Sequence, residues 1–208
     1  MLRSWIRKYV LPREVDFLSA MHDQAHWVKQ LTDDLYRCFR TPRQKHCSAI
    51  EEDHQHARTL RDNNMRDLLH TFITPVDRES IYRVVTQLDW AAISLRHFAL
   101  QAEAYGITQL DSVYVDMIRQ IRLQAELLTA GFKTIKSDPQ KTAQSAARVR
   151  DAYDHLVQQY IETNARLIRE NTTRDTLQYH ELLFQLKDIS QHMRMTANSL
   201  EDIVMKMA

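Results

Sequence analysis

The sequence predicts an all-α protein of long antiparallel helices, and three observations lead to this fold class. Glycine occurs only twice in 208 residues, whereas Leu, Gln, Arg, Ala and Met, which favour helices, are abundant. Apolar residues recur every three or four positions over long segments, which is the period of a helix. Prolines and polar breaks separate these segments, and no segment shows the alternating pattern of a strand.

Six helical segments are expected, at residues 13–40, 43–73, 75–105, 108–136, 139–170 and 174–207. Proline is tolerated in the first turn of a helix but not in its interior. Four segments begin at or just after a proline, namely Pro12, Pro42, Pro75 and Pro139. Gly106 predicts the end of the third segment, and Thr108 is the expected N-cap of the fourth. The polar run ENTTRDT at 170–176 separates the last two segments.

Each segment, taken in chain order, has a face that we expect to be buried. The first carries Leu18, Met21, Ala25, Val28, Leu35 and Phe39; the second carries Ile50, Ala57, Leu60 and Leu68, interrupted at Asp53 and Asn64. The third carries Ile81, Val84, Leu88, Ala91, Leu95, Phe98 and Ala102, and the fourth Leu110, Tyr114, Met117, Ile121, Ala125 and Leu128. The fifth carries Val149, Tyr153, Leu156, Tyr160 and Leu167, and the sixth Leu182, Leu186, Ile189, Met193, Leu200, Ile203 and Met207. Narrow stripes on long helices joined by short turns predict antiparallel bundle packing.

A weak internal sequence similarity suggests that the chain consists of two related halves. VTQLDWAAI at 85–93 and LFQLKDISQ at 183–191 share Gln-Leu, and each lies in the third segment of its half. We therefore expect one domain over residues 1–208, built of two pseudo-repeated three-helix bundles at about 12–105 and 108–208.

The charge balance excludes some classes of protein. A net charge of +1 with 26% charged residues indicates a folded chain and gives no reason to expect a nucleic-acid partner. Residues 1–11 form a basic amphipathic arm, in which Trp5, Ile6, Tyr9 and Val10 alternate with Arg3, Arg7 and Lys8. This arm either packs on its own domain or makes a short contact with a membrane surface or a partner. We expect it to bind anionic membranes weakly at most.

Cys38 and Cys47 are the only cysteines. They are too few and too loosely spaced for a disulfide framework or a zinc knuckle. They are therefore interpreted as reduced thiols in a cytoplasmic protein.

The run TFITPVDRESIYRVV at 71–85 reads locally as the start of a helix. The Thr74 hydroxyl can accept a backbone N–H as an N-cap, and Pro75 fits the first helical position. Asp77 approximates a capping box, and Asp77 with Glu79 places negative charge at the positive end of the helix dipole. We expect Thr74→Ala to remove an N-cap and to cost about 1 kcal/mol.

The longer run TFITPVDRESIYRVVTQLD resembles the hallmark of the PhoU-like phosphate-uptake regulators, in particular their branch of Pit accessory proteins. The match lies at Thr74, Pro75, Asp77, Arg78, Glu79 and Ile81, whereas Ser80 replaces the usual acid. Residues 12–28 and 197–208 resemble the opening and closing helices of the family. The resemblance implies two three-helix halves and a non-enzymatic accessory role in inorganic phosphate transport. The implied partner is a phosphate permease or a signalling protein, and the implied location is cytoplasmic or peripheral at the inner face of the membrane.

Members of this family typically bind multinuclear metal clusters through acid-x-x-x-acid pairs, because acids at i and i+4 share a helix face. Carried over to this chain, the acid positions fall on His54 and Arg58, Asp89 and Ile93, Arg150 and Asp154, and Lys187 and Gln191, with Asp188 adjacent. No pair is intact, so we expect no metal and no cofactor. An ion pair of Arg58 with Asp89, or of Lys187 with Asp154, is expected to take the place of the cluster.

Two alternatives remain open at this point. The chain could bind metal through an altered site of His54, Asp89, Asp154 and Asp188, or it could be a helical scaffold that has lost the phosphate role. His22 and His26, and Glu51-x-x-His54, have metal-ligand spacing, but chance pairs are expected with ten histidines. Asp151, Asp154 and His155 cluster without a nucleophile, so no catalytic residue is predicted. A homo-oligomer is possible.

Overall fold

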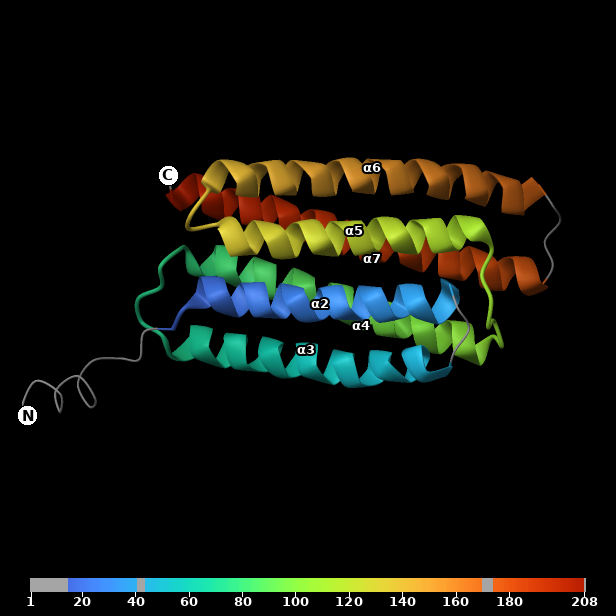
Figure 1. Cartoon of the computed structure of the whole chain (residues 1–208), viewed down its shortest axis with the longest axis horizontal. Helices are drawn as coiled ribbons and strands as arrows, with labels where there is room; N and C mark the ends of the chain where they lie inside the picture. The colour runs from blue at the N-terminus through green and yellow to red at the C-terminus, as the bar shows by residue number, and fades with distance from the viewer. Residues whose placement is uncertain (1–14, 41–43, 170–173, 208) are drawn as a thin grey trace, which may run out of the picture.

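The computed structural model describes residues 15–40, 44–169 and 174–207, which contain helices and no strand (Figure 1). The helices are α2 (Phe17–Arg40), α3 (Gln44–His70), α4 (Arg78–Ala104), α5 (Ser112–Thr134), α6 (Pro139–Arg169) and α7 (Arg174–Met207). These bounds confirm the all-α prediction and lie within a few residues of the expected segments. The predicted N-terminal arm, 1–11, lies outside the described residues.

The predicted apolar stripes form the core. The stripes of α2 and α4 are buried throughout, as are those of α5 and α7 except at Leu110, just before α5, and at Met207. Met207 is 41% exposed, because it stands in the last turn of α7, where no further helix covers it. Tyr153 and Tyr160 on α6 are half-buried. Buried residues of both halves belong to a single apolar cluster.

The two halves pack through their corresponding helices. α2 lies against α5, and the pairs between them run in opposite directions along the chain: Asp16 with Lys136, the Ala25 carbonyl with Thr129, and Asp33 with Arg122. α4 and α7 are likewise antiparallel neighbours. The first helix of one half therefore packs its apolar face on the first helix of the other half, and the third helix on the third.

Polar contacts along the α4–α7 seam recur with a seven-residue period on α4. Ser80 hydrogen-bonds Asp202 at 2.7 Å, Gln87 hydrogen-bonds His192 at 2.9 Å, Ser94 hydrogen-bonds Asp188 at 3.4 Å, and Gln101 contacts Gln185. A seven-residue period keeps one helix face turned toward its partner over two turns. These contacts set the antiparallel register of the seam.

A buried glutamine on the first helix of each half ties its three helices together. In the first half, Gln24 Nε2 donates to the Val85 carbonyl on α4 at 2.9 Å, and Asn64 of α3 donates to Gln24 Oε1 at 3.0 Å. In the second half, Gln124 Nε2 donates to the Val149 carbonyl on α6 at 3.1 Å, and Ser190 of α7 donates to Gln124 Oε1 at 2.8 Å. Each glutamine thus bonds both other helices of its half, although the second and third helices exchange the donor and acceptor roles between the halves. The bond from Asn64 explains why this residue interrupts the apolar stripe of α3.

Outside the 71–77 turn, the boundaries predicted at Pro139 and Gly106 are confirmed and the one at Thr108 is wrong. Pro139 is the first residue of α6, and Gly106 has φ +72° just beyond α4, where a left-handed residue closes the helix. Thr108 does not cap α5, which begins at Ser112 after Asp111. The connection is longer than expected because the chain must cross from one half to the other.

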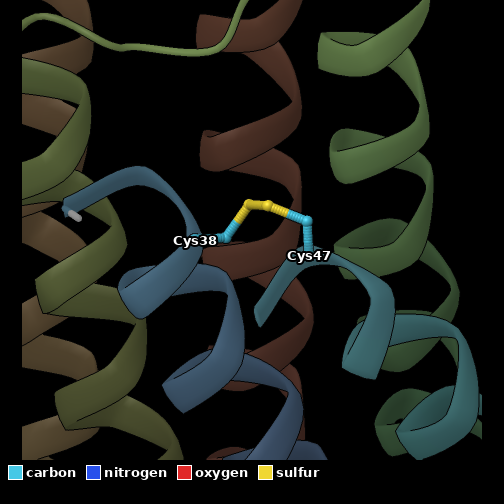
Figure 2. Close-up of a disulfide and its surroundings, with 2 residues drawn as sticks. All are labelled: Cys38 and Cys47. Atoms are coloured by element: carbon cyan, nitrogen blue, oxygen red, sulfur yellow. A yellow bond between two sulfur atoms is a disulfide. The ribbon is translucent and has the colours of Figure 1, made fainter. Parts of the chain in front are cut away.

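The two cysteines form a disulfide, which corrects the prediction of reduced thiols. Figure 2 shows the bond between Cys38, near the end of α2, and Cys47, in the first turn of α3. The antiparallel turn brings their Cα atoms to 5.1 Å, within the range that a disulfide needs. Sequence spacing alone did not show this proximity. Because disulfides are rare in the cytosol, the pairing removes the thiol argument for a cytoplasmic location.

Candidate functional site

Three regions carry the residues that the sequence singles out: the turn at 71–77 with the start of α4, the α3–α4 face, and the α6–α7 face. The turn precedes α4, and its Thr74 hydroxyl donates to the Val76 carbonyl at 2.7 Å. The N-cap of α4 is Asp77, whose carboxylate accepts a backbone N–H two residues later at 3.3 Å. The predictions that Thr74 is an N-cap and that Pro75 is the first helical residue were therefore wrong. Buried Val76 anchors the turn, so that the helix starts only at Arg78.

Arg78 closes the preceding helix. Its guanidinium donates to the carbonyls of Leu68 and Thr71, at the end of α3. The last carbonyls of a helix have no partner within the helix, and a cationic donor also suits the negative end of the dipole. One signature residue thus holds the C-terminus of α3 against the start of α4.

Ser80, where the resemblance implies an acid, donates a hydrogen bond to a carboxylate of another helix. Its hydroxyl lies 2.7 Å from Asp202 Oδ2 on α7, and Arg83 donates to the same oxygen at 2.7 Å. Lys206 Nζ lies 2.9 Å from Asp202 and 3.1 Å from Asp77. The hydrogen bonds from Ser80 and Lys206 lower the pKa of Asp202 and keep it charged. The signature therefore joins the start of α4 to the end of α7.

On the α3–α4 face, Asp89 pairs with Arg61 and not with the predicted Arg58. Arg61 Nε lies 3.4 Å from Asp89 Oδ2, and the Asp89 side chain is only 16% exposed. Burial raises the pKa of Asp89, and the charge of Arg61 opposes this shift. Arg58 is exposed and acts on Asp89 only through space. The prediction of an arginine beside Asp89 was correct in charge, but the residue lies one turn further along α3 than predicted. Ile93, one turn after Asp89 on α4, is half-buried.

His54 lies in a cationic setting on the same face. It is 7% exposed, and its Nδ1 has no hydrogen-bond partner among the described residues. Burial and the nearby charge of Arg96 lower its pKa, so the neutral ring is favoured. Glu51, which shares the Glu-x-x-His spacing, is engaged by Arg96 Nε at 2.5 Å. The carboxylate that a metal would require here is already paired with a cation.

The α6–α7 face carries a second replacement. Arg150 donates to both oxygens of Glu201 on α7, at 2.7 and 3.2 Å, which is a bidentate pair. Asp154, one turn further along α6, is exposed. Arg150, where the resemblance implies an acid, thus joins α6 to α7 directly.

Lys187 does not pair with Asp154, contrary to the prediction. Its Nζ lies 5.3 Å from the ring centre of Tyr160 and 4.7 Å from that of Phe184, which are cation–π distances. The reason is that Asp154 faces solvent, while the two rings flank the lysine on the seam between α6 and α7. The neighbouring position, Gln191, is half-buried.

Asp188 contacts α7 and α4 instead of the α6 acid. Its Oδ2 lies 3.5 Å from Nε2 of His192, one turn on, and 3.4 Å from the Ser94 hydroxyl. The His192 ring stacks on Trp90, with ring centres 6.2 Å apart. This cluster belongs to the α4–α7 seam.

The side chains present do not fit a multinuclear metal cluster. Within the described ranges, no three His, Cys, Asp or Glu side chains come close enough together to hold a metal ion. The four residues of the metal alternative are divided: His54 and Asp89 lie on α3 and α4, Asp154 is exposed on α6, and Asp188 of α7 contacts Ser94 of α4. His22 is half-buried beside Asp23, and His26 is exposed. Asp151, Asp154 and His155 are all exposed on α6.

Sequence reasoning missed three residues that organise these regions: Arg61, Glu201 and Asp202. A search for a counter-charge one helical turn from each substituted position would have found Arg61, three residues after Arg58. Glu201 and Asp202 were inaccessible to such a search because they depend on the register between distant helices.

The comparisons place this geometry among known folds. No protein-family model matches the chain. The UPF0111 protein YkaA of Bacillus subtilis strain 168 is 27% identical over 146 residues, which cover 69% of this chain and 71% of that protein. A PhoU-like protein from Shewanella oneidensis MR-1 superposes with a TM-score of 0.78 at 10% identity, over 91% of this chain and 99% of that one. The fold is PhoU-like.

A second solved structure agrees with this assignment. PhoU from Pseudomonas aeruginosa superposes with a TM-score of 0.72 at 16% identity, over 91% of this chain and 96% of that one. The PhoU-like fold therefore covers both halves of the chain. At these identities the similarity concerns the fold, and function needs its own argument.

Proposed function

We propose that this protein is a non-enzymatic accessory or regulatory protein of inorganic phosphate transport, which acts by contact with a Pit-type permease. The observation that carries the proposal is the PhoU-like fold over 91% of the chain, found together with the hallmark run at 74–81. Structures with this fold are named as PhoU and as a PhoU-like phosphate regulatory protein. The resemblance of the hallmark to the Pit accessory branch supports the choice of partner.

We further propose that the metal motif of the family is degenerate in this chain. The pairs Arg61–Asp89 and Arg150–Glu201 each contain a residue at which the resemblance implies an acid, namely Asp89 and Arg150. The pair Glu51–Arg96 lies beside His54, and all three pairs join neighbouring helices. A fixed cation beside a carboxylate removes the charge that would otherwise attract an ion. The helices are then held together without metal, and the protein presents rigid surfaces for a partner.

The outer face of α4 is well suited to such a contact. Tyr82 and Trp90 are 50% and 49% exposed although both are large aromatic side chains. They stand two turns apart and so lie on one side of the helix. Tyr and Trp are enriched among the residues that dominate binding energy at protein interfaces.

Two measurements test the function. Deletion of the gene should change the rate of radiolabelled phosphate uptake through the permease, and the full chain should restore it. The affinity-purified protein should retain the permease in detergent. Tyr82→Ala with Trp90→Ala should weaken this retention about tenfold or more, whereas Ile161→Ala, at an exposed position on α6, should leave it unchanged. Unaltered uptake together with no retention would refute the proposal.

A further inference from the structure

The disulfide joins two helix ends that differ in how they are held. Cys38 is 5% exposed, and its neighbour Phe39 packs edge-on against Phe98 of α4, with ring centres 5.6 Å apart. The end of α2 is therefore anchored in the core by contacts other than the disulfide. Cys47, in the first turn of α3, is exposed (Figure 2). One sulfur of the bond thus belongs to a fixed helix end, and the other belongs to a helix end at the surface.

The helix that carries Cys47 lies at the edge of the bundle (Figure 1). Within the residues that the structure describes, α3 contacts α2 and α4 and no helix of the second half. Over its length it is the least apolar of the six described helices, none of which is long and apolar enough to span a membrane. Between Cys47 and Leu60 the buried side chains are those of Ile50, His54 and Ala57. A segment that buries so little apolar surface gains little free energy from packing.

The C-terminal part of α3 is fastened by contacts that do not depend on the disulfide. Asn64 Nδ2 donates to Gln24 Oε1 on α2 at 3.0 Å, and both side chains are buried. Arg78 donates to the carbonyls of Leu68 and Thr71 at the end of the helix. This part of α3 is therefore expected to stay in place when the disulfide is cut.

The N-terminal part of α3 has weaker attachments. Glu51 pairs with Arg96 of α4, but the Glu51 side chain is 49% exposed, and exposed ion pairs add little to stability. The Nδ1 atom of buried His54 has no hydrogen-bond partner among the described residues, and water would satisfy it once the helix moved outward. Asp53 shares a hydrogen bond with Asp34 of α2, which lasts only while one of the two carboxyl groups is protonated. The covalent bond at Cys47 thus matters more here than at the other end of the helix.

We propose that the Cys38–Cys47 disulfide is a redox switch, whose reduction releases residues 47–60 of α3 from α2 and α4 while the other helices stay folded. The reductant is a protein dithiol of the Cys-x-x-Cys class. Its first thiolate attacks the exposed Cys47 sulfur, which forms a mixed disulfide and expels Cys38 as a thiolate that takes up a proton. The second thiol of the reductant attacks the mixed disulfide, so that Cys47 leaves and is protonated and the reductant becomes a disulfide. Two electrons and two protons pass to this chain in all. The switch goes beyond the proposed contact with a permease, since it concerns a change within α3.

Hydrogen–deuterium exchange with mass spectrometry tests the release. The full chain is measured unreduced and after reduction with dithiothreitol, with α6 as the internal control, because it too lies at an edge, against α5 and α7, but carries no cysteine. We expect reduction to speed exchange at residues 47–60 about tenfold more than in α6. Cys38→Ser with Cys47→Ser should show the fast exchange with and without dithiothreitol, and slow exchange in its α5 and α7 checks that it is folded. Equal acceleration at 47–60 and in α6 would mean that reduction only lowers global stability, and would overturn the proposal, as would no acceleration at 47–60.

Trp27 provides a local signal for the same movement. His56 of α3 stacks on Trp27 of α2, with ring centres 4.4 Å apart. In a chain that carries Trp5→Phe and Trp90→Phe, Trp27 is the remaining tryptophan. Reduction should shift its emission to longer wavelength, because departure of His56 exposes the indole to water. Emission that is the same before and after reduction would contradict the release.

Trapping with a variant reductant tests the route of the electrons. A thioredoxin whose second active-site cysteine is replaced by serine cannot complete the exchange, so the mixed disulfide accumulates. We expect mass spectrometry to find this adduct on Cys47, because Cys38 is buried. An adduct on Cys38, or none at all, would refute attack by a protein dithiol at the surface of α3.

Discussion

Asp89 is neutralised by Arg61 because of the register between two helices. Glu51 of α3 lies opposite Arg96 of α4, and the antiparallel course of the helices then brings residue 61 across from residue 89. Arg58 is one turn short of this position and remains exposed. At the residue scale, the kind of charge was predictable, while the particular residue was decided by packing.

A double-mutant cycle measures this pair. Arg61→Ala should destabilise the wild type by about 1 kcal/mol, an estimate reduced for the partial exposure of the arginine, and should cost less in an Asp89→Ala background. Arg58→Ala is the matched control and should change the free energy of unfolding by less than about 0.5 kcal/mol. Urea denaturation provides these values. Equal costs of Arg61→Ala in the two backgrounds would contradict the pairing.

Asp53, which interrupts the apolar stripe of α3, is a second residue whose behaviour depends on packing, because its surroundings in the bundle change its pKa. Burial raises its pKa to about 7, and a hydrogen bond with Asp34 of α2 and the charges of Asp34 and Glu52 add to the effect. Asp34 also lies 3.4 Å from Arg37. The folded protein therefore holds a proton on Asp53 at a pH where the unfolded chain has released it.

The sign of the pH dependence follows from this difference. Between the unfolded pKa, 3.8, and the folded pKa, about 7, the folded state binds more protons, so the contribution of Asp53 to stability falls as pH rises and then levels off. Asp53→Asn should remove this decline and should melt at a higher temperature than the wild type at pH 8. Melting curves from pH 5 to pH 8 test this prediction, with Asp151→Asn, at an exposed position of α6, as the control. A wild-type decline that persists in Asp53→Asn would show that other groups cause it.

At the scale of elements, the α2–α3 and α3–α4 helix pairs are each held together by a different interaction. The α2–α3 hairpin is closed by the disulfide Cys38–Cys47, and the α3–α4 turn by Arg78 on the carbonyls of α3. The disulfide and the Arg78 contacts lie at opposite ends of α3, since Cys47 is in its first turn and Leu68 in its last. α3 has the least continuous apolar stripe of the six segments, so covalent and capping contacts at its ends compensate for a smaller buried face.

Removal of the disulfide should therefore be costly for α3. The loop between the cysteines spans a sequence separation of 9, and loss of a cross-link that closes such a short loop is expected to cost about 2–3 kcal/mol. Cys38→Ser with Cys47→Ser should unfold at correspondingly lower urea concentration. Addition of a reductant should lower the stability of the wild type and leave the double variant unchanged. Two free thiols in the unreduced wild type would rule the bond out.

At the scale of the molecule, the halves share their core. α2 packs on α5 and α4 on α7, and buried residues from both halves lie in one apolar cluster. Gly131 on α5 permits the close approach of α7, since an added Cβ would lie 2.8 Å from Leu200 Cδ2. The two three-helix units are thus halves of one core.

A shared core predicts one cooperative unfolding transition. Calorimetry should give a single peak whose calorimetric and van't Hoff enthalpies agree. Leu156→Ala, at a fully buried position of α6 in the second half, should cost about 2–5 kcal/mol. It should lower the midpoint reported by Trp27 and Trp90, which both lie in the first half. A tryptophan midpoint unaffected by this variant would mean that the halves unfold separately.

The sequence by itself determined the helices and their buried faces. Helix formation depends on local propensity, and burial depends on a period of three to four residues, and both are written along a single segment. Pro139 and Gly106 mark boundaries for local reasons, because proline fixes its own φ near the helical value and glycine tolerates the left-handed φ that ends a helix. The relation between the halves was visible only faintly in sequence, as a shared Gln-Leu, and it stays a prediction, although Gln24 and Gln124 each bond both other helices of their half.

Only the tertiary structure decided which side chains meet. Thr74 and Asp77 are both capable N-caps, and the burial of Val76 selected Asp77. Arg61, Glu201 and Asp202 acquired their partners through the register between helices, and Cys38 reached Cys47 through a turn. A shift of one helical turn changes every such pair while the apolar stripe stays buried. Pairing between helices therefore depends on the packing of the whole bundle, which no single segment encodes.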